Sequence, residues 1–264
     1  MPTIRIDDAD PAVLDGRHIR ASAFEAAQRE LIDTLRPTST VAGQPRPRAL
    51  TIGAGYAPLP RLLAHAGYQV TALDPSPKAT DAARRQAADE VAEDVAVIDY
   101  RVREHTGLVE PHDTYELVWC LDTLEVAPDP GGTLAEIARV TRPGGSIVLD
   151  TLNNTLVSRA IYLGLFQRVP FTRVMPPDRY HRERLLRPTA LAAACDEAGI
   201  TIRKIIGYEP GSPIGLLRAL LARRRGSVQD GDLADLARFR LSAPGHTPPV
   251  TYYAIATPSP KRPG

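Results

Sequence analysis

The sequence has no excess of charge of either sign. Its 264 residues include 32 lysines and arginines against 31 aspartates and glutamates, which gives a formal net charge of +1. Proteins that bind nucleic acid concentrate basic residues on one face, so this composition argues against a nucleic-acid partner. Cysteine is also scarce, because Cys120 and Cys195 are too few for a disulfide framework and lack the spacing of zinc ligands. We therefore expect a protein of the reducing cytoplasm.

Long apolar runs are missing as well. No uninterrupted run reaches the roughly 18 residues that a membrane-spanning helix needs. The acidic N-terminus, MPTIRIDDADP, lacks the apolar centre of a secretion signal. The chain is nevertheless 43% hydrophobic, which is enough for a full core. Its length fits one large domain, or one domain with an elaborated lid.

Strand and helix patterns alternate through the first half of the chain. Apolar runs such as RALTIG and YQVTALD alternate with helical segments such as PRLLAHAG and GGTLAEIARVT. This alternation predicts an α/β fold with a Rossmann-like, mostly parallel sheet of seven strands and helices on both faces. The last strand, VTYYAIATP, is expected to pair antiparallel with ITIRKIIGYEP at the sheet edge.

A glycine turn follows the first predicted strand. Gly53 and Gly55 allow the backbone to approach a ligand without a Cβ clash. Asp74 ends the second strand, where a carboxylate can accept hydrogen bonds from both hydroxyls of a ribose. The third glycine of a dinucleotide fingerprint is replaced by Pro58, which has no N–H. S-adenosylmethionine, which carries no phosphate, is therefore favoured over a nicotinamide dinucleotide.

The segments from Leu50 to Thr257 resemble a known family. YELVWCLDTLEVAPDPGGTLAEIARVTRPGGSIVLDTLN looks like the class I S-adenosylmethionine-dependent methyltransferases. Its continuation to VTYYAIATP is similar to the ubiquinone-biosynthesis O-methyltransferases (3-demethylubiquinone 3-O-methyltransferase). The resemblance implies methyl transfer to oxygen of a phenolic, quinol-like or polyketide-like small molecule. This chain departs from the family at Thr51, where the family has an acid, and at Val126, where it has histidine.

These departures leave two alternatives open. The fold could serve a non-methylating reaction, such as a cyclisation in natural-product biosynthesis, or the chain could be a non-catalytic partner subunit. The second alternative predicts side chains that fill the space beside Gly55.

The resemblance also implies roles for single residues at the cofactor. Gly53 and Asp74 match its cofactor-binding glycine and ribose-binding acid. Leu121 matches a position whose backbone lies beside the cofactor. Arg29 matches an arginine that reaches the cofactor's carboxylate, for which paired N–H donors suit it; the alternative is a solvated arginine on a helix.

Three further residues are candidates for the chemistry. Asp122 and Glu125 match acids linked in the family to a divalent metal or to activation of the phenol, and the pair could hold Mg²⁺ weakly. The alternative is that Glu125 caps the following loop and Asp122 bonds backbone. His181 matches a family histidine near the acceptor and is the predicted general base. It is favoured over His105 and His112, which flank the loop before the fourth strand; its alternative is a surface histidine.

The chain divides into five predicted parts. The insert LVSRAIYLGLFQRVPFTRVMPP is apolar with interspersed arginines, so it is expected to shape a hydrophobic acceptor pocket as a lid, or to contact a membrane surface through residues 155–176. The predicted parts are an N-terminal helical cap at 1–46, a cofactor-binding core at 47–154, a lid inserted after the fifth strand at 155–186, a C-terminal helix with edge strands at 187–258 that contains a helical insert at 213–238, and a disordered tail at 259–264.

Overall fold

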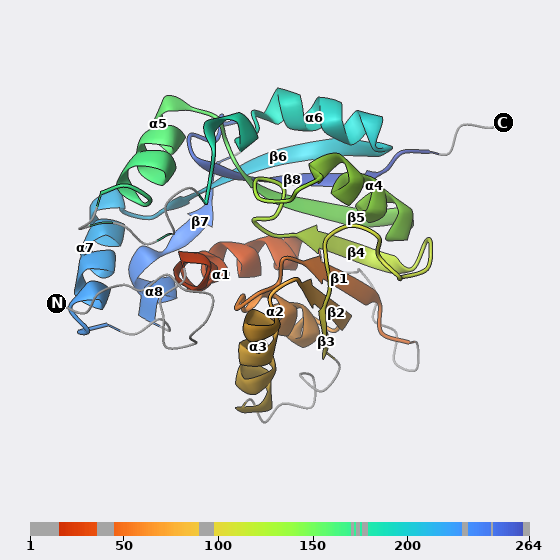
Figure 1. The fold of residues 1–264 in the computed structure, drawn as a ribbon, viewed down its shortest axis with the longest axis horizontal. Coiled ribbons are helices and arrows are strands. Elements are labelled where there is room, and N and C mark those ends of the chain that lie inside the picture. Colours follow the sequence, from red (N-terminus) through yellow and green to blue (C-terminus); the bar gives the residue numbers. More distant parts are fainter. Residues whose placement is uncertain are drawn as a thin grey trace.

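A single eight-stranded sheet organises the protein (Figure 1), whose structure is a computed structural model. The structure describes residues 16–35, 45–89, 98–169, 172, 175, 179–228, 232–243 and 245–260. The strand order is β3-β2-β1-β4-β5-β8-β6-β7. The strands are β1 (Arg48–Ile52), β2 (Gln69–Asp74), β3 (Ile98–Val102), β4 (Tyr115–Cys120), β5 (Thr141–Leu152), β6 (Ile200–Pro210), β7 (Phe239–Leu241) and β8 (Thr251–Pro258).

Helices cover both faces of this sheet, as the alternation predicts. The helices are α1 (Gly16–Leu35), α2 (Leu59–His65), α3 (Pro77–Asp89), α4 (Pro130–Val140), α5 (Leu156–Ser158), α6 (Pro188–Glu197), α7 (Pro213–Arg224) and α8 (Leu233–Ala237). Helices α1, α2 and α3 lie on one side, and α4 and α6 lie on the other (Figure 1). Local chemistry sets some of the boundaries: Asp129 caps α4 by accepting a 2.9 Å hydrogen bond from Gly132 N, and Pro130 occupies the first turn.

The prediction of seven strands is wrong by one. Strands β1 to β5 are mutually parallel. Strand β8 pairs antiparallel with β6, as expected, and also with β5. The additional strand is β7, three residues that pair antiparallel with β6. A three-residue strand is too short to show a period-2 pattern. The β6–β8 pair therefore does not form the sheet edge, because β7 lies outside it.

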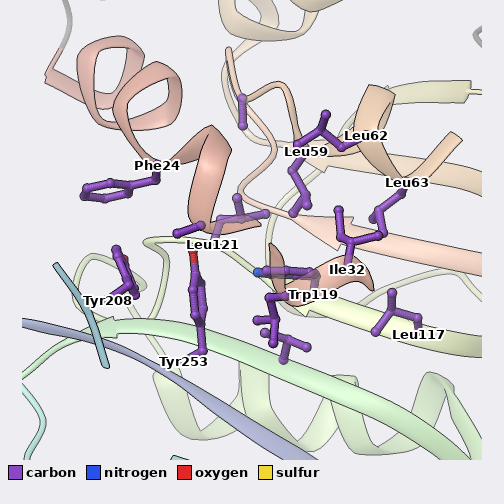
Figure 2. Close-up of a cluster of buried hydrophobic side chains, with 14 of the residues drawn as sticks. Phe24, Ile32, Leu59, Leu62, Leu63, Leu117, Trp119, Leu121, Tyr208 and Tyr253 are labelled. Atoms are coloured by element: carbon purple, nitrogen blue, oxygen red, sulfur yellow. The ribbon is translucent and has the colours of Figure 1, made fainter. Parts of the chain in front are cut away.

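The largest core cluster packs α1 and α2 against the sheet (Figure 2). From α1, Phe24 meets the ring of Tyr208 edge-on with ring centroids 4.9 Å apart. Tyr208 in turn stacks on Tyr253 at 4.4 Å, and Trp119 lies edge-on to Tyr253 at 5.6 Å. Strands β4, β6 and β8 are therefore joined to α1 by one aromatic group, which fixes α1 over the carboxyl ends of the strands.

The insert after β5 is partly helical. It contains α5 and a π-helix at Arg159–Leu165, followed by a 3₁₀ turn at Arg182–Arg184. Tyr162, Met175 and Tyr180 form a separate buried cluster with Leu152 of β5, so the insert packs on the sheet as a layer of its own. Predictions for residues 1–15 and 261–264, parts of the cap and the tail, lie outside the described residues. No helix in the described part of the chain is long and apolar enough to cross a membrane.

Glu125 clamps the loop after β4 to the end of β5. Its Oε1 accepts a 2.5 Å hydrogen bond from Thr151 Oγ1 and a 2.6 Å hydrogen bond from Leu152 N. Burial, reinforced by the nearby charge of Asp122, raises the pKa of the Glu125 carboxyl to about 7. This matches the alternative in which Glu125 holds the loop.

Truncating the buried face of α1 should destabilise the protein. Leu31 is fully buried in the core, so Leu31→Ala should lower the free energy of unfolding by about 3 kcal/mol. The matched control is Leu156→Ala, because Leu156 is 79% exposed. Urea titrations followed by circular dichroism would compare them, and equal small losses would mean that α1 does not pack as described.

Glu125 should make stability depend on pH. The folded protein holds the Glu125 proton more tightly than the unfolded chain does. Its contribution to the free energy of unfolding is therefore complete below about pH 4.5 and is lost as the pH rises through about 7. Glu125→Gln keeps an acceptor for Thr151 and Leu152 but does not titrate, so its stability relative to wild type should rise by about 3 kcal/mol over that window.

Urea titrations at a series of pH values would measure this difference, with the exposed Glu104→Gln as the control for a surface carboxyl. Parallel pH curves for wild type and Glu125→Gln would show that Glu125 titrates normally in the folded protein.

Candidate active site

Five of the predicted site residues line one cavity at the carboxyl ends of the strands. The cavity has a volume of about 110 Å³ and includes Gly53, Gly55, Asp74, Leu121 and Asp122 in its wall. This is the edge of a parallel sheet at which ligands bind, where the strand order turns from β1 to β4.

The glycine turn is shaped by the loop that follows β4. Gly53 has φ 74°, and a Cβ at this position would overlap the carbonyl oxygen of Leu121 and the hydroxyl of Thr123. Leu121 itself is held by a 2.9 Å hydrogen bond from its N–H to the carbonyl oxygen of Ile52. Only glycine fits this crossing without a shift of the neighbouring backbone. At this turn, the backbone of residues 53–55 can therefore contact a ligand directly.

Asp74 occupies the position expected of the ribose-binding acid. It is buried at the end of β2, and its Oδ1 accepts a 2.9 Å hydrogen bond from Ser76 N. A Cβ at Gly55 would lie 3.3 Å from Oδ2, so glycine at this position avoids a tight contact with the carboxylate. The turn and the acid together fit the adenosine end of S-adenosylmethionine.

Arg29 does not lie at this cavity. Its side chain is 60% exposed and forms an ion pair with Glu25 one helical turn away, with Nη2 and Oε1 2.6 Å apart. The neighbouring residue, Gln28, lines the cavity instead and is only 1% exposed. The placement therefore corresponds to the alternative of a surface arginine.

Asp122 connects the cavity to the insert after β5. Its two carboxylate oxygens accept hydrogen bonds of 2.5 and 2.7 Å from the hydroxyl of Tyr180, and Arg179 Nη2 lies 3.3 Å from Oδ2. Asp122 has φ 41°, an uncommon backbone conformation for a residue with a side chain. Arg179 and Val126 also line the cavity. The residue predicted to act with Glu125 thus faces the cavity, while Glu125 belongs to the clamp on β5.

The described residues do not form a set of magnesium ligands around Asp122 and Glu125. No group of three or more histidine, cysteine, aspartate or glutamate side chains comes together within the described ranges of the chain. Asp122 is engaged with Tyr180 and Arg179, and Glu125 with Thr151 and Leu152.

His181 is exposed and does not line the cavity. It precedes the 3₁₀ turn at Arg182–Arg184, which corresponds to the alternative of a surface histidine. His105, which the sequence favours less than His181, is buried and lines the cavity. It follows β3 by three residues, so its place at the carboxyl end of a strand was the signal that could have found it.

Asp150 is a cavity residue that sequence reasoning missed. It is 3% exposed and lies within β5, and its Oδ1 accepts a 2.5 Å hydrogen bond from the hydroxyl of Tyr208. An aspartate inside the apolar run SIVLDTL was an available signal, because strands buried on both faces seldom carry a charge unless it has a partner or a ligand.

Comparisons with known proteins agree with this geometry. A methyltransferase domain family model matches residues 50–149. The ubiquinone biosynthesis O-methyltransferase of Xanthomonas euvesicatoria pv. vesicatoria (strain 85-10) is 31% identical over 166 residues, which are 62% of this chain and 67% of that protein.

Solved structures show the same fold. Magnesium protoporphyrin IX methyltransferase from Synechocystis PCC 6803, with bound S-adenosylhomocysteine, has a TM-score of 0.56 and 16% identity, with 92% of this chain and 86% of that one covered. The [4+2]-cyclase SpnF has a TM-score of 0.55 and 17% identity, with 88% of this chain and 82% of that one covered. By its family match and its identity to the O-methyltransferase, this chain belongs to the class I S-adenosylmethionine-dependent methyltransferases.

Proposed function

We propose that the protein methylates an oxygen of a phenolic or quinol-like small molecule and that it works in the cytoplasm. The observation that carries the proposal is that the glycine turn, Asp74 and Asp122 share one cavity, which Arg179 of the insert also lines. The similarity to a ubiquinone biosynthesis O-methyltransferase supports oxygen as the acceptor atom. S-adenosylmethionine supplies an activated methyl group when it is bound, so the protein's task is mainly to align an acceptor oxygen.

Asp122 is the residue best placed to orient that oxygen. A carboxylate can accept a hydrogen bond from a phenol hydroxyl and increase the electron density on its oxygen. The Tyr180 hydroxyl and the Arg179 guanidinium both stabilise the charged carboxylate. They also tie Asp122 to the lid, so that closure of the lid and placement of the acceptor depend on the same contacts.

The two alternatives have less support. A non-catalytic subunit predicts a plugged space beside Gly55, whereas the cavity there is open. A non-methylating reaction draws on Thr51 and Val126, and on a fold shared with a [4+2]-cyclase. That likeness concerns the fold alone, and Asp74 and the turn retain what a methyltransferase needs.

Binding of S-adenosylhomocysteine, measured by isothermal titration calorimetry, tests the proposal directly. A micromolar dissociation constant is expected, and absence of heat at millimolar ligand would remove the proposal. Transfer of an isotope-labelled methyl group to a panel of catechols and quinols would then identify the acceptor class.

Substitution should separate the roles of Asp122 and His181. Asp122→Asn should lower kcat about 100-fold or more and should weaken the binding of S-adenosylhomocysteine much less, because Asp74 and the glycine turn still hold the adenosine end. His181→Ala should leave kcat within about twofold, because His181 lies outside the cavity wall. Equal losses in the two variants would restore His181 as the base.

We also propose a peripheral membrane contact through residues 155–176. Leu156 and Val157 of α5 are 79% and 51% exposed, and Arg168 and Arg182 lie exposed in the same insert. Apolar side chains beside arginines suit an anionic lipid surface. Sedimentation with vesicles of phosphatidylglycerol should retain the wild type and release a Leu156→Glu, Val157→Glu variant, with zwitterionic vesicles as the control. Equal retention of both proteins would exclude this surface.

A further inference from the structure

Two buried acceptor side chains meet the cavity from different elements. Gln28 comes from α1 and Asp150 from β5, and they are 1% and 3% exposed. The Oε1 atom of Gln28 is buried and receives no hydrogen bond from the described residues. A buried polar atom of this kind carries a free-energy cost unless a ligand completes it.

Strand register places Asp150 beside the glycine turn. Ile52 of β1 is aligned with Cys120 of β4, and Cys120 with Leu149 of β5. The next residues along the three strands, Gly53, Leu121 and Asp150, therefore follow one another across the sheet. Asp74 ends β2 on the other side of β1. A ligand that crosses these strand ends meets Asp74 at one end and Asp150 at the other.

The position of Asp150 is rigidly supported. Tyr208, which donates to Asp150, stacks on Tyr253 and meets Phe24 edge-on. Phe24 lies one helical turn before Gln28 and also lines the cavity. The aromatic group that anchors α1 therefore holds both acceptors in place.

The side chains of Asp150 and Gln28 are suited to binding a cation. An ionised carboxylate only accepts hydrogen bonds, and the amide oxygen of Gln28 is a buried acceptor that receives no hydrogen bond from the described residues. The described cavity wall contains three carboxylates, Asp74, Asp122 and Asp150, against the single guanidinium of Arg179. Such a wall favours a ligand with net positive charge.

We propose that Asp150 and Gln28 form an ammonium-binding site, which holds the α-ammonium group at the methionyl end of the cofactor. This inference rests on the proposed function. It accounts for Thr51, whose buried hydroxyl oxygen has no hydrogen-bond partner among the described residues and which does not line the cavity. The negative charge absent from β1 is supplied by β5, two strands away in the sheet.

The test compares two ligands that differ only in the ammonium group: S-adenosylhomocysteine and its deamino analogue, in which hydrogen replaces that group. By calorimetry the wild type should bind the deamino analogue about 10- to 100-fold more weakly, as expected for loss of a charged hydrogen bond. Asp150→Asn should weaken the binding of S-adenosylhomocysteine by a similar factor and should change the affinity for the deamino analogue by no more than about twofold. Gln28→Leu should reduce the discrimination in part.

Tyr208→Phe is the matched control, because it removes the hydrogen bond to Asp150 and keeps the carboxylate. It should retain discrimination between the two ligands. The proposed ammonium-binding site is refuted if the wild type binds both ligands with equal affinity, a comparison that needs no variant. It is also refuted if Asp150→Asn weakens the binding of both ligands by the same factor. Absence of any binding of S-adenosylhomocysteine to the wild type would overturn the proposed function itself, which separates the two failures.

Discussion

The close crossing between Gly53 and the loop after β4 sets the geometry of the whole site. The carbonyl oxygen of Leu121 and the hydroxyl of Thr123 occupy the space that a Cβ at position 53 would need. Thr123 is held there by a 2.6 Å hydrogen bond from its hydroxyl to the Leu121 carbonyl oxygen. These two touching segments form part of the cavity wall, together with Gln28 of α1, Asp74 and Arg179. The cavity is thus a consequence of backbone packing.

The sequence was sufficient for features that depend on local pattern. Strands such as Leu117–Cys120 are buried on both faces, so their apolar runs identify a parallel sheet. The acid at the end of β2 is likewise fixed by its strand. Arg29 lies outside the cavity because an α-helix turns by about 100° per residue, which directs Gln28 to the cavity instead. Which face of α1 turns toward the sheet is determined by Phe24, which packs on Tyr208 of β6 and Phe239 of β7, far along the chain.

The remaining site residues depend on long-range pairing. Asp150 reaches the glycine turn only through the register of β1, β4 and β5. Arg179 and Tyr180 meet Asp122 across 57 and 58 residues of sequence. His181 is adjacent to this pair, yet the backbone turns it outward. Neighbouring positions in a loop therefore have opposite environments, which no spacing rule predicts.

The place of β8 has a consequence for the order in which the chain can assemble. This strand follows the other described strands in the sequence, yet it lies between β5 and β6 and pairs with both. A growing polypeptide on the ribosome can form β1 to β5 early, but β6 and β7 have no partner in that sheet until residues 251–258 emerge. Helix α1 contacts β7 and α8, so its packing is complete only after residues 233–241 have been synthesised. Late termination products should therefore expose the apolar face of α1 and be substrates for chaperones and proteases.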